Sequence, residues 1–166
     1  MPIGWGWHPY FKLEDQLVDD LNLKLSKVNQ INCDARMIPL GTEQLYTDFS
    51  TSKTIHSTQL DTCFRSIEEQ NKVLVSLESQ DHQLSIWQNA KHYPFVQIYT
   101  PDDRKSIAIE PMTCGVNAFN NQATSNSLLL EVISSSASTI VFLICLATAS
   151  MIFVQTELPN CLYICP

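Results

Sequence analysis

Basic residues are missing from the last third of this 166-residue chain, which has no lysine or arginine after Lys105. Over the whole sequence, ten basic residues stand against seventeen acidic ones, and the formal net charge is −7. This excess of negative charge argues against nucleic acid as a partner, because a phosphate backbone needs a basic surface to replace its counterions.

Glycine is also scarce, with four residues in all, and the sequence has no glycine-rich phosphate loop, no HExxH motif and no GxSxG motif. No two cysteines have CxxC spacing, and Cys161 and Cys165 have no histidine nearby, so a zinc site is not expected. The sequence thus has none of these motifs for binding a metal or a phosphate group. The first residues lack the basic and apolar regions of a secretory signal, which predicts a cytoplasmic protein with reduced thiols.

Short β-strands are predicted over residues 4–121, because apolar and polar residues alternate there with a period of two. The alternation or a β-like apolar pattern occurs at residues 21–25, 73–77, 84–86, 95–99 and 106–110. Polar segments separate neighbouring strands at residues 78–83 and 100–105, and we interpret residues 102–105 as a solvated turn with local charge pairing. No segment keeps an apolar helical stripe over three turns. The predicted fold is all-β and antiparallel.

The composition changes at residue 122, which predicts two parts: a β portion over 1–121 and an atypical tail over 122–166. The tail is rich in serine and threonine and contains the apolar run IVFLICLATASMIFV at 140–154, with no charge between Glu131 and Glu157. Such a run could cross a bilayer, although no basic residue flanks it. A buried helix or a pair of core strands are the alternatives.

His8 is the first candidate for chemistry because of its surroundings. It lies in GWGWHPYF, residues 4–11, where two glycines and a proline constrain the backbone and aromatic rings flank the histidine. Aromatic faces suit the apolar face of a sugar ring, so the segment could form one wall of a carbohydrate site. The alternative is a strand end packed with aromatic core residues.

Three further polar side chains complete the set of candidates. Glu110 ends an apolar strand, where burial would raise its pKa and make it a better general base; an edge glutamate paired with an arginine is the alternative. Asp61 is either a turn residue or a hydroxyl acceptor. Gln97 lies between Val96 and Ile98, and its amide either lines a cleft or lies exposed.

The motifs that contain these residues resemble the aldose 1-epimerase (galactose mutarotase) family. GWGWHPYFKL is similar to the family's histidine motif, LDTCF to its Leu-Asp motif, and PFVQIYTPDDRKSIAIEPMTCGVNAFN to its glutamine strand and Glu-Pro motif. The matches follow the family's order and cover residues 4–121, and the last of them is long and specific.

The resemblance implies a large antiparallel β-sandwich whose concave face holds a free aldohexose such as galactose or glucose. Carried over by motif, His8 matches the general acid and Glu110 the general base. Asp61 and Gln97 match residues that hydrogen-bond sugar hydroxyls. The implied activity is the interconversion of α and β anomers by ring opening, without a metal or cofactor.

The chain is shorter than the family's members, and the tail resembles nothing in the family. The part that precedes the histidine motif in the family, with a further histidine and an arginine of the sugar site, has no counterpart here. We therefore expect an incomplete sandwich with open edges, and an isolated chain that is unstable or inactive. The alternatives are a non-catalytic carbohydrate-binding remnant and a membrane-tethered protein anchored by residues 140–154.

Overall fold

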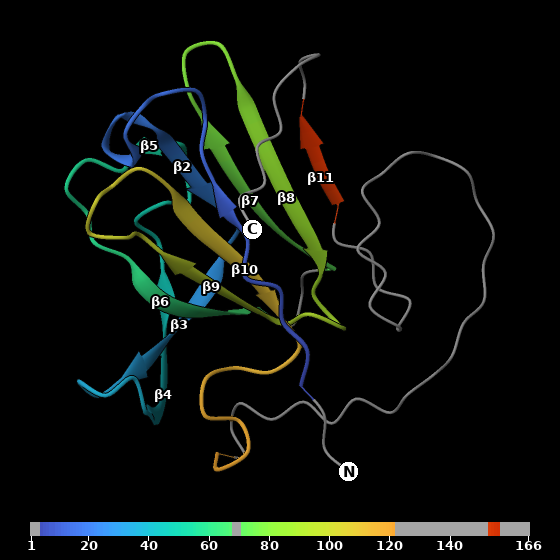
Figure 1. The fold of residues 1–166 in the computed structure, drawn as a ribbon. Helices are drawn as coiled ribbons and strands as arrows, with labels where there is room; N and C mark the ends of the chain where they lie inside the picture. Colours follow the sequence, from blue (N-terminus) through green and yellow to red (C-terminus); the bar gives the residue numbers. More distant parts are fainter. Residues whose placement is uncertain (1–3, 68–70, 122–152, 157–166) are drawn as a thin grey trace.

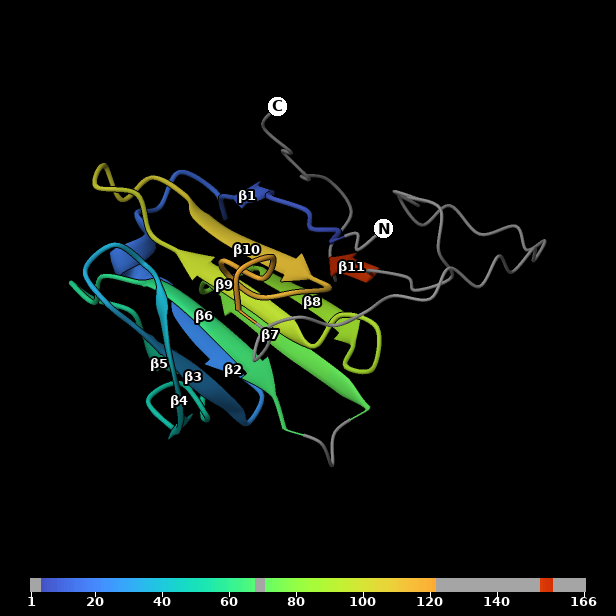
Figure 2. The same ribbon diagram turned by 90° about the horizontal axis from the view of Figure 1, so that it is seen from below.

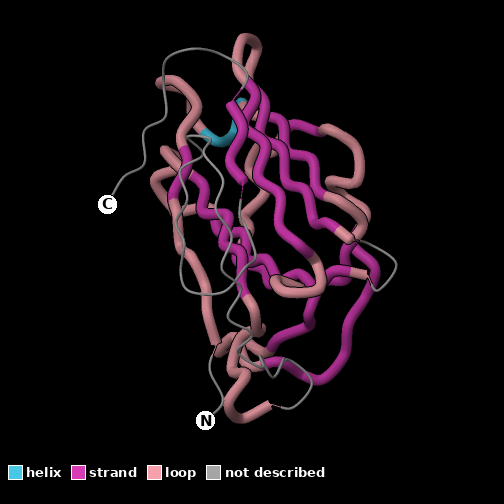
Figure 3. Tube along the Cα trace, turned by 90° about the vertical axis from the view of Figure 1, so that its right-hand side faces the viewer, coloured by secondary structure: helices cyan, strands magenta, loops and turns pink. Residues whose placement is uncertain are grey.

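The structure is a computed structural model that describes residues 4–67, 71–121 and 153–156. These residues form two antiparallel sheets packed face to face (Figures 1 and 2). The helical content of the described residues is one short 3-10 turn, η1 (Val18–Asp20), coloured cyan in Figure 3. The prediction of an all-β, antiparallel sandwich is confirmed.

The first sheet has six strands. In spatial order they are β1 (Tyr10–Phe11), β10 (Ile107–Met112), β9 (Phe95–Tyr99), β6 (Asp61–Ser66), β3 (Val28–Cys33) and β4 (Pro39–Tyr46). Neighbours in space are often far apart in sequence, so the sheet brings the histidine segment at the N-terminus beside β10. A register shift in the β3–β4 ladder falls between Ile31 and Cys33.

The second sheet has five strands. In spatial order they are β11 (Phe153–Thr156), β8 (Gln83–Asn89), β7 (Lys72–Glu78), β2 (Asn22–Leu25) and β5 (Lys53–Thr54). β7 and β8 form the predicted hairpin, in which Glu78 and Gln83 are the last paired residues and Ser79 N–H donates to the carbonyl of His82 at 2.8 Å.

The main hydrophobic core lies between the two sheets and draws on alternate residues of both. The five-stranded sheet contributes apolar side chains such as Leu23 and Val75, and the six-stranded sheet contributes Phe64, Ile98 and Ile109, all at most 1% exposed. The alternation read from the sequence is therefore the alternation between this core and the opposite faces of the strands.

The six-stranded sheet has a second face, turned away from the five-stranded sheet, which we call the outer face. Part of it carries a small apolar cluster of Ile31, Cys63 and Phe95, covered by partly buried residues that include Met112 and Val116. The candidate site lies on this same face.

Several strands had no clear sequence signal. β3 and β4 were not predicted, and six of the eight residues of β4 are exposed, because this strand forms an edge of the sheet. Asp61, which the sequence allowed as a turn residue, is the first residue of β6. An exposed edge strand has no apolar alternation from which it could be read.

Most of the apolar run at 140–154 lies outside the described residues, as does most of the predicted tail over 122–166. The last two residues of that run, Phe153 and Val154, belong to β11, which pairs with β8. Within the part of the chain that the structure describes, no helix has the length and apolar character needed to cross a membrane.

Candidate active site

Glu110 and His8 are in contact at the edge of the outer face. His8 Nε2 lies 3.1 Å from Glu110 Oε1. Their side chains differ in accessibility, because 56% of the histidine is exposed but only 11% of the glutamate. The sequence left open an arginine as the partner of Glu110; the partner in the structure is this histidine.

Backbone pairing with β10 holds His8 in place. Trp7 N–H donates to the carbonyl of Pro111 at 3.1 Å, and Ile109 N–H donates to the carbonyl of Pro9 at 3.4 Å. These two bonds hold the backbone on both sides of His8, and the His8 ring lies against the side chain of Glu110 on β10. A glycine is needed at position 4 for a steric reason, because a Cβ on Gly4 would clash with Cys114 Sγ.

The aromatic residues around His8 divide between the two faces of the sheet. The Tyr10 ring lies beside the histidine, with ring centroids 5.0 Å apart. Trp7 and Phe11 pack edge to face at 6.1 Å, and both contact the main core. The expected aromatic wall is therefore split, because alternate residues of an extended segment point to opposite sides.

Asp61 and Gln97 are joined by a hydrogen bond on neighbouring strands. Gln97 Nε2 donates to Asp61 Oδ1 at 2.7 Å. Asp61 is exposed, whereas Gln97 is only 8% exposed, so the structure excludes the interpretation of Gln97 as a surface amide. The ladder between β9 and β10 places Gln97 directly opposite Glu110. The four candidates therefore lie together, on β6, β9, β10 and the segment before β1.

The electrostatics of the site act mainly on Glu110. Burial raises the pKa of the Glu110 carboxyl, because a charged carboxylate loses hydration there. His8 opposes this shift, and the nearby charge of Asp61 raises the pKa of Glu110 further. The pKa of Tyr10 is also raised, by burial and then by Tyr99 and Glu110. A carboxylate with a raised pKa is a stronger base at neutral pH.

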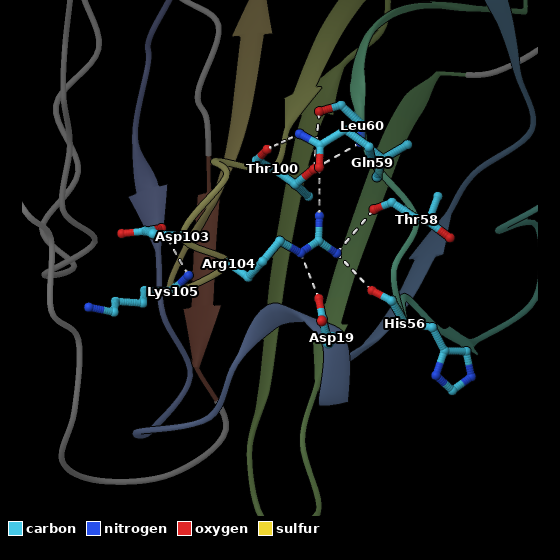
Figure 4. A network of polar contacts seen from close by, with 9 residues as sticks. All are labelled: Asp19, His56, Thr58, Gln59, Leu60, Thr100, Asp103, Arg104 and Lys105. Carbon is cyan, nitrogen blue, oxygen red and sulfur yellow. Dashed lines mark hydrogen bonds and ion pairs between the residues drawn. The ribbon is translucent and has the colours of Figure 1, made fainter.

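Arg104 is a residue whose importance sequence analysis missed. Three residues of the predicted solvated turn, Asp102, Asp103 and Lys105, are exposed as expected. Arg104 differs, because only 15% of its side chain is exposed and it is tethered to distant segments. Its guanidinium donates to Asp19 Oδ1 at 2.6 Å and to Gln59 Oε1 at 3.0 Å (Figure 4). It also donates to the backbone carbonyls of His56 at 2.7 Å and Thr58 at 3.1 Å. Two of the acceptors are backbone atoms far away in sequence, which no local pattern reveals.

This network fixes the start of β6. Leu60 N–H donates to Thr100 Oγ1 at 2.8 Å, and Thr100 N–H donates to the carbonyl of Leu60 at 2.8 Å. Gln59 Nε2 donates to the Thr100 carbonyl at 2.5 Å (Figure 4). Since Asp61 follows Leu60 directly, these bonds position the aspartate at the site.

Metal ligands are not gathered anywhere in the described ranges, where no group of three or more His, Cys, Asp or Glu side chains could hold an ion. What the site offers instead is an imidazole against a buried carboxylate, with a hydrogen-bonded Asp–Gln pair beside it. Groups of this kind are able to exchange protons and to form hydrogen bonds with a ligand.

Comparison with known proteins gives a consistent family. The sequence profile described as aldose 1-epimerase matches residues 1–132. The uncharacterized protein YihR of Escherichia coli (strain K12) is 28% identical over 135 residues, which cover 78% of this chain and 42% of YihR.

Solved structures agree on the fold. A galactose mutarotase-like protein from Clostridium acetobutylicum has a TM-score of 0.60 at 22% identity, covering 75% of this chain and 42% of that one. A galactose mutarotase related enzyme from Lactobacillus acidophilus has a TM-score of 0.53 at 18% identity, covering 68% and 40%. The chain spans about two fifths of the length of these relatives.

The fold and the site together define a β-sandwich of the galactose mutarotase-like type with a histidine–glutamate pair on its outer face. The chain belongs to the aldose 1-epimerase family. The resemblance seen in the motifs is therefore confirmed.

Proposed function

We propose that this chain carries the acid–base centre of an aldose 1-epimerase and interconverts the α and β anomers of a free aldohexose such as galactose or glucose. The observation that supports this most directly is the contact of His8 Nε2 with Glu110 Oε1 at 3.1 Å. The proposal also draws on the family of the chain.

Ring opening requires a base that reaches the hydroxyl on C1 of the sugar and an acid that reaches the ring oxygen, which is bonded to the same carbon. Glu110 takes the proton from the hydroxyl on C1, while His8, as imidazolium, gives a proton to the ring oxygen. The bond between C1 and the ring oxygen breaks, and its electron pair stays on that oxygen. Rotation about C1–C2 and closure with the proton transfers reversed give the other anomer. Because both oxygens are bonded to C1, an acid and a base that lie in contact suit the reaction.

Asp61 and Gln97 would orient the sugar. The second carboxylate oxygen of Asp61 can accept a hydrogen bond from a sugar hydroxyl, and Gln97 has a second amide hydrogen to donate. The existing bond between the two side chains, 2.7 Å long, reduces the number of orientations that each can adopt. Ordering of these groups before the sugar binds lowers the entropic cost of binding.

Polarimetry of freshly dissolved α-glucose or α-galactose tests the proposal with the full chain. We expect mutarotation faster than the uncatalysed rate, and we expect Glu110→Gln to lower the rate constant by about 10²- to 10⁴-fold. Glu14→Gln is the matched control, because Glu14 Oε1 lies 2.8 Å from His82 Nδ1 and so forms a Glu–His pair outside the site. The control should keep the activity.

The sequence alone predicts the opposite result, an isolated chain that is unstable or inactive. We expect activity because His8 and Glu110 are already in contact in the structure. If the folded chain and its Glu110→Gln variant both leave the uncatalysed rate unchanged, catalysis by this chain is ruled out. Binding of galactose that survives Glu110→Gln, measured by ligand-observed NMR without any rate acceleration, would indicate the carbohydrate-binding alternative.

A further inference from the structure

One buried acceptor in the site has no partner. Among the residues that the structure describes, Gln97 Oε1 is the one buried side-chain nitrogen or oxygen without a hydrogen bond. The residue is 8% exposed, and solvent does not reach this oxygen. A buried acceptor that stays unpaired is costly, so an unpaired one in an acid–base site calls for a functional explanation.

The orientation of the Gln97 amide is determined by Asp61. A carboxylate only accepts hydrogen bonds, so the atom that faces Asp61 Oδ1 at 2.7 Å must be the amide nitrogen. Turning the amide over would place oxygen against oxygen. The carbonyl oxygen of Gln97 therefore points away from Asp61.

Two residues oppose Gln97 in the sheet. On one side Cys63 of β6 is its register partner, and a thiol is only a weak donor. On the other side Glu110 of β10 is its register partner. Directly opposed side chains share a face and have Cβ atoms about 4.5–5.5 Å apart. Gln97 thus lies between two acidic residues: Asp61, which is bonded to its amide nitrogen, and Glu110, its register partner on the other side.

We propose that Gln97 Oε1 accepts a hydrogen bond from Glu110 whenever Glu110 is protonated, which in the reaction is the period when the sugar ring is open. An ionised Glu110 has no hydrogen to donate, which explains why the acceptor is unpaired in the resting site. A sugar hydroxyl is a poorer candidate, because the oxygen is not accessible from solvent. This inference rests on the proposed function.

The proton balance of the reaction is unchanged by this bond. Glu110 receives the proton of the C1 hydroxyl as the bond from C1 to the ring oxygen breaks, and His8 protonates the ring oxygen. While C1–C2 rotates, the new O–H of Glu110 turns toward Gln97. On closure Glu110 returns its proton to the C1 oxygen, and His8 recovers its own from the ring hydroxyl.

The bond exists only after proton transfer, so it stabilises the open-chain stage and not the resting state. Gln97 would then have two roles: its nitrogen holds Asp61, and its oxygen lowers the barrier to protonation of Glu110. A neutral hydrogen bond of ordinary strength corresponds to about a two- to tenfold effect on rate.

Other groups around Glu110 must be considered in any titration. His8 precedes β1 and favours the ionised carboxylate, whereas Asp61 on β6 disfavours it. Tyr10 on β1 is near enough to have its own pKa raised by Glu110. None of these three residues is altered by a substitution at Gln97, although Asp61 loses its amide partner.

The test is an NMR titration of the full chain without sugar, with ¹³C-labelled glutamate and the Glu110 signal assigned through Glu110→Gln. In Gln97→Met we expect the pKa of Glu110 to fall by about half a unit to one unit, because the protonated form loses its acceptor. Gln83→Met is the matched control, since Gln83 bonds Glu78 on the surface hairpin and should leave Glu110 unchanged.

An unchanged or raised pKa in a folded Gln97→Met variant would overturn the inference. Infrared difference spectra of the unsubstituted chain and Glu110→Gln at low pH give a second test, because a protonated Glu110 with the O–H stretch of a free hydroxyl would also overturn it. In kinetics we expect a two- to tenfold lower kcat. A higher KM with unchanged kcat and pKa would show that Gln97 acts on the sugar alone. A pKa shift in a chain without mutarotation would contradict the proposed function but support the Gln97–Glu110 bond.

Discussion

The two faces of the six-stranded sheet are made by the same strands but obey different physical rules. On β9 and β10 the core-facing residues, such as Ile98 and Ile109, are fully buried and belong to the main hydrophobic cluster. The residues between them on the outer face include Gln97 and Glu110, which are nearly as buried but polar. One face contributes stability by burying apolar surface, whereas the other keeps polar groups at some cost in stability.

The buried polar residues of the outer face are costly for stability. A fold selected for stability alone would place apolar side chains at positions as buried as Gln97 and Glu110. Here a buried carboxyl with a raised pKa lies beside an acceptor that has no partner. Such groups occur at functional sites, because chemistry needs them and the core on the other face compensates for their cost.

The largest effect on stability is expected from the core face. Phe64 is 0% exposed and lies in the main cluster, so Phe64→Ala should lower the free energy of unfolding by about 3–5 kcal/mol. Urea denaturation followed by circular dichroism measures this. A loss below about 1 kcal/mol would mean that the described core does not determine the stability of the chain.

A smaller effect is expected at the loop that leads into the outer face. Arg104→Ala removes four hydrogen bonds, two of them to the backbone of the 56–58 segment, and should cost about 1.5–3 kcal/mol. Urea denaturation is again the measurement, with the exposed neighbour Lys105→Ala as the control. Equal midpoints for the two variants would contradict the tether.

The free energy of unfolding should depend on pH through Glu110. The pKa of Glu110 in the folded chain lies above the ordinary value of 4.5. At pH values between these two pKa values, the folded chain binds more protons than the unfolded chain. The free energy of unfolding therefore falls as the pH rises from 4.5 through the folded pKa of Glu110. At higher pH the cost of the buried charge remains. Glu110→Gln should flatten this slope and make the variant relatively more stable at neutral pH than at pH 4.

Denaturation of the parent and the variant at a series of pH values checks this result. The lost contact with His8 should matter little, because more than half of the histidine side chain is exposed. A variant that becomes less stable relative to the parent as pH rises would show that Glu110 is better stabilised as a carboxylate than the structure indicates.

The smallest effect is expected on the outer face beside Phe64. Arg65 Nη1 lies 3.0 Å from Glu43 Oε1, and 42% of the Arg65 side chain is exposed. Its guanidinium carbon lies 5.8 Å from the centroid of the Phe95 ring. Arg65→Ala should cost less than about 1 kcal/mol, since exposed ion pairs and cation–π contacts are weak. A loss equal to that of Phe64→Ala would remove the distinction between the two faces.

How far the sequence carried the prediction depended on periodicity. The hairpin of β7 and β8 was predicted from alternating residues, and its core face produces the alternation. The strand β9 was predicted from a β-like apolar pattern, because nearly all of its residues are buried. β4 was missed because most of its residues are exposed on both faces at an edge of the sheet. Motif order, rather than any local pattern, brought the four candidate residues into one hypothesis.

By itself, the sequence determined the all-β class, the family and the identity of the four candidate residues, because alternation and short motifs are local properties of a chain. Only the tertiary structure decided that His8 contacts Glu110, that Gln97 is buried with one unpaired oxygen, and that Arg104 fixes the start of β6. Each of these depends on strands and loops that are distant in sequence and become neighbours only when the sheet forms.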